Sequence, residues 1–369
     1  MIGMRLIDNI EKIDSRQWNE LLVASRTRSF FQTRECYDLY AANPEFMKPF
    51  CFAVDDGGKL KGVIIGYIQA DGGKAKRFLS RRAIINSGPL LADNISDEAL
   101  TMLLTECRKR LQGKAIYVEC RNFEDYSEYK NVFKQCGFEY VPHLNFHIDT
   151  SSEEIVNQNL GKSRKRDIRT SFRDGAEIVE QPTLGEVRDF YTILHDLYIN
   201  KVKTPLYPIS FFEHLFQQDY SKFLLVRLNE KIVGGTVCVC LPGYAVYEWF
   251  ACGKDGVHKN IYPSTVATYA GIRCAAQNGY QHFDMMGAGK PGDGYGVRDF
   301  KAKFGGQLVE HGRFVHVLNP ALYGVGKMGV KVIKGELTSE MGGAFLSLLH
   351  SCKRLWQHKD GCIESNKQP

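Results

Sequence analysis

An internal repeat constrains the fold of this 369-residue chain more than any other feature. Each half holds the same expected order: a β-hairpin, a helix, a strand, a second helix and a final strand. The hairpin turns lie at residues 56–62 (DGGKLKG) and 229–234 (NEKIVG), and the long helices that follow run to Gly113 and Gly279, as helix C-termini commonly do. Matching positions are about 170 residues apart. The repeat predicts an α/β protein made of two similar domains, 1–148 and 149–319.

The predicted boundary lies near Thr150, where Ser151–Glu154 has the pattern of a helix start. Residues 320–369 follow the repeat and are predicted to form two short helices, at 322–337 and 343–358. Their apolar residues have the spacing of a single helix face, so we expect this tail to pack back onto a domain. A basic helix lying on a membrane surface is the alternative.

Composition excludes several classes of protein. The chain is 44% hydrophobic and 24% charged, which is ordinary for a soluble globular protein, and no apolar run is long enough to span a bilayer. The first residues lack a secretory signal, so a cytoplasmic location is expected. Eleven cysteines show no paired spacing typical of zinc sites, so neither a metal nor another cofactor is expected. The net charge of +6 is small for a dedicated nucleic-acid binder, although its basic clusters favour anionic partners.

The strongest functional pattern lies in residues 279–306. A short strand ending near Asp284 leads into the loop AGKPGDGYG, whose four glycines and one proline allow sharp bends and leave backbone amides free. A helix with a lysine between two aromatic residues follows, at Phe300, Lys301 and Phe304. Together these features predict a substrate cleft. The two phenylalanines are four residues apart and are equally explained by packing in a core.

Five motifs are spread along the chain: SFFQT at 29–33, SGPL at 87–90, KSRKRDIR at 162–169 with RDGAE at 173–177, Phe-Asp ending at 284, and FKAKFGG at 300–306. Together they resemble the motifs of the FemAB-like aminoacyltransferases, the enzymes of peptidoglycan interpeptide bridges. The resemblance implies two tandem GNAT-like (acyl-CoA N-acyltransferase type) domains, each a mixed, mostly antiparallel sheet flanked by helices. It also implies transfer of an aminoacyl group from aminoacyl-tRNA to an amine of a peptidoglycan precursor or similar cell-envelope acceptor, with peripheral contact to a membrane-bound precursor.

The resemblance also implies where the active site lies. Lys301 is expected to stabilise the negative charge of the tetrahedral intermediate, and a surface lysine is the alternative. Asp284 and Glu248 lie where a GNAT domain places its general base, although such carboxylates often cap amides instead. The acceptor is expected to bind at Lys201, Lys203, Tyr207, Arg166, Arg169, Phe300 and Phe304.

Two departures from the family pattern concern the donor. A CoA-dependent GNAT domain holds pyrophosphate on the amides of a glycine-rich turn, but the turn at 258–264 has no glycine and Pro263 removes a donor. This disfavours CoA, while a donor phosphate could still meet the side chains of Lys254, His258, Lys259 and Ser264. Only eight residues separate Asn200 from the next helix, so the coiled-coil arm of some family members is missing and tRNA contacts must come from surface patches.

Two other functions stay open. One is an acyl-CoA-dependent N-acyltransferase that acts on an amino sugar or another small amine. The other is a non-catalytic tandem GNAT-like protein that binds a cell-envelope or nucleic-acid partner. The first half has Glu119-Cys120-Arg121 where the second has Asp284-Met285-Met286, which indicates that the first half is itself inactive. A nucleophilic serine is not expected, because the sequence lacks a G-x-S-x-G elbow.

Overall fold

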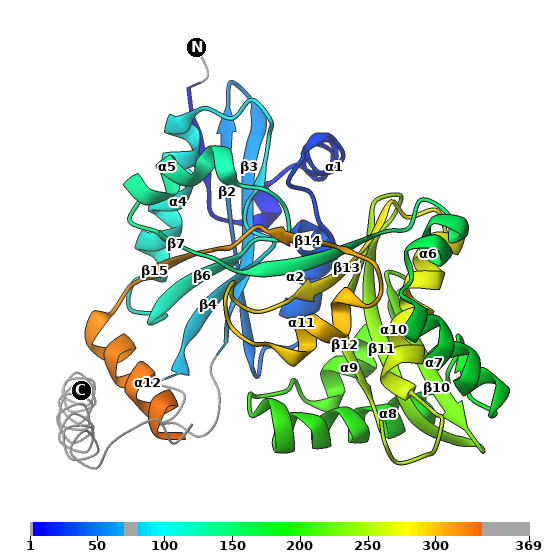
Figure 1. Ribbon diagram of the computed structural model, residues 1–369. Coiled ribbons are helices and arrows are strands. Elements are labelled where there is room, and N and C mark those ends of the chain that lie inside the picture. Colours follow the sequence, from blue (N-terminus) through cyan, green and yellow to red (C-terminus); the bar gives the residue numbers. More distant parts are fainter. Residues whose placement is uncertain (1–2, 70–79, 334–369) are drawn as a thin grey trace, which may run out of the picture.

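The computed structural model describes residues 3–69 and 80–333, which form two β-sheets with helices around them (Figure 1). The strand order of the first sheet is β1 (Arg5–Ile7), β2 (Met47–Asp56), β3 (Lys59–Gln69), β4 (Arg82–Asn86), β6 (Tyr117–Arg121), β15 (Arg313–Val317) and β7 (Glu139–Val141), with β5 (Leu90–Leu91) beside β3. The order of the second sheet is β9 (Glu177–Val179), β10 (Ser221–Leu228), β11 (Lys231–Leu241), β12 (Ala245–Gly253), β13 (His282–Gly287), β8 (Leu144–Asp149) and β14 (Gln307–Glu310).

The two sheets repeat one pattern, which confirms the predicted fold class. The hairpins β2–β3 and β10–β11 hold equivalent second and third places. Each sheet has one parallel pair, β4–β6 or β12–β13, and its other described pairs are antiparallel. A long helix precedes the second strand of each parallel pair: α4 (Asp97–Leu111) in the first half and α10 (Pro263–Gln277) in the second.

The sheets exchange one strand each, which the sequence analysis does not anticipate. Strand β8 comes from the first half of the chain but lies in the second sheet, between β13 and β14. Strand β15 comes from the second half but lies in the first sheet, between β6 and β7. The sheets therefore differ from the predicted ranges 1–148 and 149–319 at these two strands, and that division of the chain stays a prediction.

The remaining helices cover both sheets (Figure 1). They are α1 (Ser15–Ala24), α2 (Arg34–Ala41), α5 (Lys130–Gln135), α6 (Glu153–Asn159), α7 (Lys162–Arg173), α8 (Leu184–Leu197), α9 (Ile209–Phe216), α11 (Gly296–Ala302) and α12 (Pro320–Ile333). Short 3₁₀ turns lie at Ile10–Lys12, Phe30–Gln32 and Ser127–Tyr129, and a π-helical turn, Tyr198–Val202, extends α8. None of the described helices is both long and apolar enough to cross a membrane.

One hydrophobic core joins the two halves. The ring of Phe31, from the predicted SFFQT motif, packs edge-on against Tyr247 and Trp249 of β12, with centroid distances of 5.5 and 5.1 Å. Such edge-to-face aromatic pairs add to the stabilisation from burial alone. In the tail, Leu322 of α12 is buried and the Tyr323 ring contacts Tyr117 of the first sheet. The predicted helix at 343–358 lies outside the described residues.

Candidate functional site

The parallel strand pairs of the two sheets differ in one respect. Strands β4 and β6 pair along their whole length, from Arg82 with Tyr117 to Asn86 with Arg121. Strands β12 and β13 pair only as far as Tyr247 with Asp284, although both strands continue beyond that point. We call this end of pairing the β12–β13 split. Within the described sheets, only the second has a parallel pair that stops in this way.

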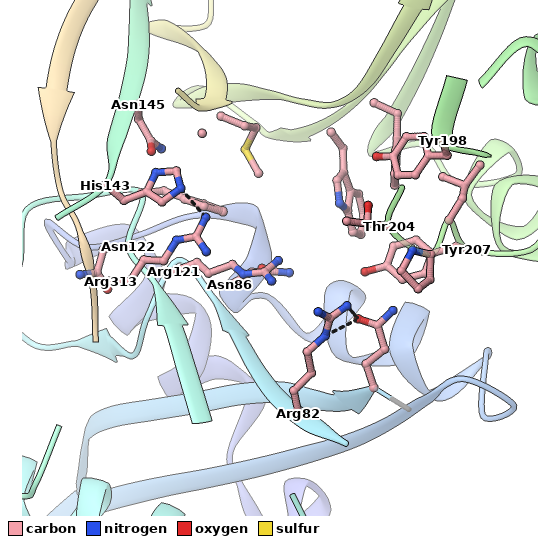
Figure 2. Close-up of a pocket in the computed structure, with 18 of the residues that line it drawn as sticks. Arg82, Asn86, Arg121, Asn122, His143, Asn145, Tyr198, Thr204, Tyr207 and Arg313 are labelled. Carbon is pink, nitrogen blue, oxygen red and sulfur yellow. Dashed lines mark hydrogen bonds between the residues drawn. The ribbon is translucent and has the colours of Figure 1, made fainter. Parts of the chain in front are cut away.

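A cavity of about 310 Å³ lies against the β12–β13 split and takes its lining from both halves (Figure 2). Trp249, Phe250, Met286 and Gly287 of the split form one wall. The segment from Thr204 to Tyr207 forms another. Polar side chains from the first sheet, from β8 and from residues next to these strands also line the cavity: Gln69, Arg82, Asn86, Arg121, Asn122, His143, Asn145 and Arg313. The volume falls within the usual range for small-molecule sites.

The charge of this cavity comes from three arginines. Arg121 forms an ion pair of 3.0 Å with Glu119, and Arg313 binds the other oxygen of the same carboxylate. Burial opposes ionisation of Glu119, but the two guanidinium groups outweigh it and lower its pKa to about 2. Arg82 donates to the side-chain oxygen of Gln69 at 3.0 Å. Within the described lining there is no Asp, Glu or Lys, so the arrangement suits an anionic ligand.

His143 supplies a neutral imidazole to the same cavity. Burial and the nearby Arg313 lower its pKa to about 4, so the ring is uncharged at pH 7. Its Nδ1 lies 3.2 Å from the carbonyl oxygen of Leu144 and its Nε2 lies 2.6 Å from Nη2 of Arg313. These contacts fit a tautomer in which Nδ1–H donates to the carbonyl and Nε2 accepts from the guanidinium.

Lys301, the predicted catalytic cation, reaches the β12–β13 split from helix α11 but is not part of the cavity lining. Its ammonium donates to the carbonyl oxygens of Met285, Met286 (3.5 Å) and Gly287 (2.9 Å). Burial lowers the pKa of Lys301, and the charge of Glu248 partly restores it. Because Met286 and Gly287 line the cavity, Lys301 holds one cavity wall in place. A direct role in catalysis stays a prediction.

The two predicted general bases also lie outside the cavity lining. Glu248 is buried and accepts hydrogen bonds from the hydroxyls of Thr268 (2.8 Å) and Thr236 (3.3 Å), and burial raises its pKa. Asp284 is fully buried and accepts from the amide of Met286 at 2.6 Å. Burial opposes its ionisation, but His147, at 3.6 Å, keeps the pKa of Asp284 below its ordinary value. Their role as bases stays a prediction.

Among the predicted acceptor-binding residues, only Tyr207 lies in the cavity. Its hydroxyl is 2.6 Å from that of Tyr67, which links the two halves. Lys201 and Lys203 are exposed and are not among the lining residues. Arg166 and Arg169 of α7 are also exposed and outside the cavity lining. Arg166 forms an ion pair of 3.0 Å with Asp167.

Phe300 and Phe304 pack as the core alternative expects. Phe304 is buried, at 1% exposed, in the core beside β8 and β13, and Phe300 is partly buried against the same core. The guanidinium of Arg164 lies 4.3 and 5.0 Å from their ring centroids and donates to the carbonyl of Phe300. Their four-residue spacing therefore reflects core packing plus a cation–π contact, and neither ring lines the cavity.

At the predicted donor site, the start of α10, backbone amides already donate hydrogen bonds to other groups of the protein. Pro263 has no amide proton, the amide of Ser264 donates to Asp255 Oδ1 at 3.1 Å, and that of Tyr262 donates to the hydroxyl of Ser171 at 3.0 Å. A Cβ on Gly253 would lie 2.4 Å from the Ser264 nitrogen, so the end of β12 touches the helix start. Three predicted donor residues, Lys254, His258 and Lys259, are exposed around this turn.

Comparisons with known proteins address the fold. No protein-family model and no curated protein matches the chain. Several solved structures are similar to this chain in fold. One is the structure of a tandem GNAT protein from the clavulanic acid biosynthesis pathway, with 10% sequence identity and a TM-score of 0.55. The match covers 86% of this chain and 99% of that protein. The fold is therefore that of the tandem GNAT proteins, as the motifs implied. Within this class the chain is similar to FemX, with 14% identity, 87% of this chain and 99% of FemX covered, and a TM-score of 0.66.

Proposed function

We propose that this protein is an acyltransferase of the Fem type, which transfers an aminoacyl group from aminoacyl-tRNA to an amine of a peptidoglycan precursor or similar anionic cell-envelope acceptor. The observation that carries the proposal is the position of the β12–β13 split against a cavity with three arginines. An acyl carbonyl placed at the split would meet an acceptor whose anionic group is held by the first half. Holding both reactants in this way converts a bimolecular reaction into an effectively unimolecular one.

The contacts at the start of α10 support a donor other than CoA. A pyrophosphate binds at a helix N-terminus through free amides, whereas here Ser264 and Tyr262 already donate to protein groups. The Asp255 carboxylate at this position would also repel a phosphate. Helix α7 instead offers a basic surface to a nucleic-acid backbone, with exposed side chains at Lys162, Lys165, Arg166, Arg169 and Arg173.

The cavity also provides a route for the proton that the acceptor amine must lose. Nε2 of the neutral His143 is the candidate proton acceptor. Arg313 occupies that nitrogen, and an anionic acceptor that draws the guanidinium toward itself would free it. Lys301 would act on the other reactant, since its charge lies behind the carbonyls of Met286 and Gly287, beside the expected position of the oxyanion.

Ligand binding and transfer test the proposal directly. Purified protein is incubated with UDP-MurNAc-pentapeptide, with acyl-CoAs and with aminoacyl-tRNA, and melting temperature and transfer of labelled amino acid are measured. At 100 times its dissociation constant a true ligand stabilises the fold by roughly 2.7 kcal/mol. We expect stabilisation by the precursor, no stabilisation by acyl-CoA, and tRNA-dependent transfer. Turnover with an acyl-CoA would overturn the donor assignment, and absence of any transfer would favour the non-catalytic alternative.

Arg121→Gln gives a specific variant for this test. Glu119 keeps its ion pair with Arg313, so the substitution removes a cavity cation without leaving a buried carboxylate unpaired. Loss of a hydrogen bond to a charged group costs about 1.5–3 kcal/mol, so KM for the acceptor should rise roughly 10- to 160-fold. Arg16→Gln removes an exposed arginine of α1 and serves as the matched control. Equal KM values in the two variants would argue against acceptor binding in this cavity.

A further inference from the structure

A second cavity adjoins the first and carries information about the acceptor. Its volume is about 670 Å³, and it shares Arg82, His143 and Arg313 with the arginine cavity. Because these three side chains line both spaces, the two cavities are direct neighbours. The first sheet and helix α12 enclose the second cavity, which we call the α12 groove.

The lining of the α12 groove differs in chemistry from that of the arginine cavity. It is mainly apolar, with contributions from Ile116, Tyr117, Val141, Val315, Leu322 and Tyr323. Its one carboxylate, Glu119, is already neutralised by Arg121 and Arg313. Two exposed lysines, Lys290 and Lys327, lie at its edge, and the Lys327 ammonium is 4.8 Å from the Tyr323 ring centroid. An apolar trough between cationic groups suits a hydrocarbon chain attached to an anion.

We infer that the acceptor is an anionic amphiphile, whose charged group lies among the cavity arginines and whose hydrocarbon chain lies in the α12 groove. This inference rests on the proposed function, because it assigns the acceptor to the same site. Since Arg82, His143 and Arg313 line both spaces, a chain in the groove would begin next to a head group held by the arginines. A chain in the groove is removed from water by the rings of Tyr117 and Tyr323 and by Leu322.

Binding of alkyl phosphates tests the inference without any acyl donor. Inorganic phosphate and butyl, hexyl and octyl phosphate are titrated into the full chain by calorimetry. Burial of one methylene group contributes about 0.8 kcal/mol, so affinity should rise by up to about fourfold per added methylene. Arg121→Gln removes a head-group cation while Glu119 of the groove keeps its ion pair with Arg313, so it should weaken all four ligands by a similar factor.

Two glycines of α12 provide a matched pair of variants. Gly326 lines the groove and a Cβ there meets no described atom within 4 Å, so Gly326→Phe is chosen to place a ring in the groove. Gly324 lies on the same helix with equally open space but outside the groove lining, so Gly324→Phe controls for the change in helix propensity. We expect only Gly326→Phe to abolish the dependence of affinity on chain length.

Two results would overturn the inference: an affinity that does not depend on chain length, or equal effects of the two glycine variants. Failure of the inference and failure of the proposed function are distinguishable. Transfer to a precursor without a hydrocarbon chain, together with a flat chain-length series, would reject the amphiphile and keep the acyltransferase. Chain-dependent binding without transfer from any donor would reject the acyltransferase.

Discussion

At the scale of single residues, Glu119 controls how the cavity arginines are held. Its pKa of about 2 in the fold lies below the ordinary value of 4.5, so its ionised form stabilises the fold above about pH 4.5. That stabilisation is lost as pH falls from 4.5 toward 2. The pKa difference corresponds to about 3 kcal/mol. We expect Glu119→Gln to lose this amount of stability at pH 7, measured by urea unfolding.

An exposed carboxylate provides the control for that measurement. Glu20 is 62% exposed and pairs with Arg16 on the surface of α1, so Glu20→Gln should change the free energy of unfolding by less than about 1 kcal/mol. The wild-type protein and Glu119→Gln should approach the same stability near pH 2. A constant difference between them from pH 7 to pH 2 would contradict the role given to Glu119.

At Lys301, an effect on stability can be separated from an effect on catalysis. Lys301→Met removes the ammonium that donates to the carbonyls of Met285, Met286 and Gly287, which should lower the free energy of unfolding by about 1–3 kcal/mol. If Lys301 also stabilises the oxyanion, turnover should fall by roughly 100- to 1000-fold. Lys303→Met changes an exposed lysine of the same segment and should change neither quantity. Lost stability with normal turnover would limit Lys301 to supporting the cavity wall.

At the scale of elements, the start of α10 depends on a carboxylate from the preceding loop. Asp255 accepts from the Ser264 amide much as an N-cap residue would, so Asp255→Ala should cost about 0.5–2 kcal/mol of stability. Asp293→Ala, in the exposed loop before α11, is the control. Thermal melts of both variants with and without acyl-CoA check the prediction. CoA-dependent stabilisation of the wild-type protein would show that the helix start can still bind phosphate.

The elements that the sequence predicts well are those fixed by local signals. Short-range backbone preferences predict the turns at 56–62 and 229–234 and the glycines that end α4 and α10. The repeat then predicts the order of these elements in each half. The exchange of β8 and β15 could not be predicted in the same way. Both are short strands that mix apolar and polar residues, and the choice of neighbour depends on contacts between residues about 130 to 200 positions apart.

The arginine cavity was missed for a related reason. Arg82, Arg121 and Arg313 lie on three strands. Arg82 ends a basic cluster of the sequence, at 74–82, which favours an anionic partner, but Arg121 and Arg313 belong to no such cluster. The repeat provides one indication of the cavity. Arg121 of the first half occupies the position equivalent to Met286 of the second half, and both residues line the cavity. The motif predicts a role for Lys301, but burial decides which atoms its ammonium can reach. That property depends on the whole fold rather than on neighbouring residues.

At the scale of the whole molecule, the exchanged strands make each half incomplete by itself. A fragment of residues 1–150 would lack β15 from within its sheet and would carry β8 without a partner. We expect fragments 1–150 and 151–369 to be unfolded or aggregated when expressed separately, and to form a soluble complex when co-expressed. Size-exclusion chromatography and circular dichroism provide the measurement. A cooperative unfolding transition in 1–150 alone would contradict this prediction.

The exchange also sets an order of events during protein synthesis. Strands β6 and β7 leave the ribosome long before β15, which must enter between them. At about 5–20 residues per second, the intervening segment of about 170 residues takes roughly 9–35 s to make. During that interval the facing edges of β6 and β7 have no partner and can pair with other chains. Nascent chains should therefore bind a chaperone until β15 emerges, and rapid synthesis of the second half would shorten their exposure to aggregation.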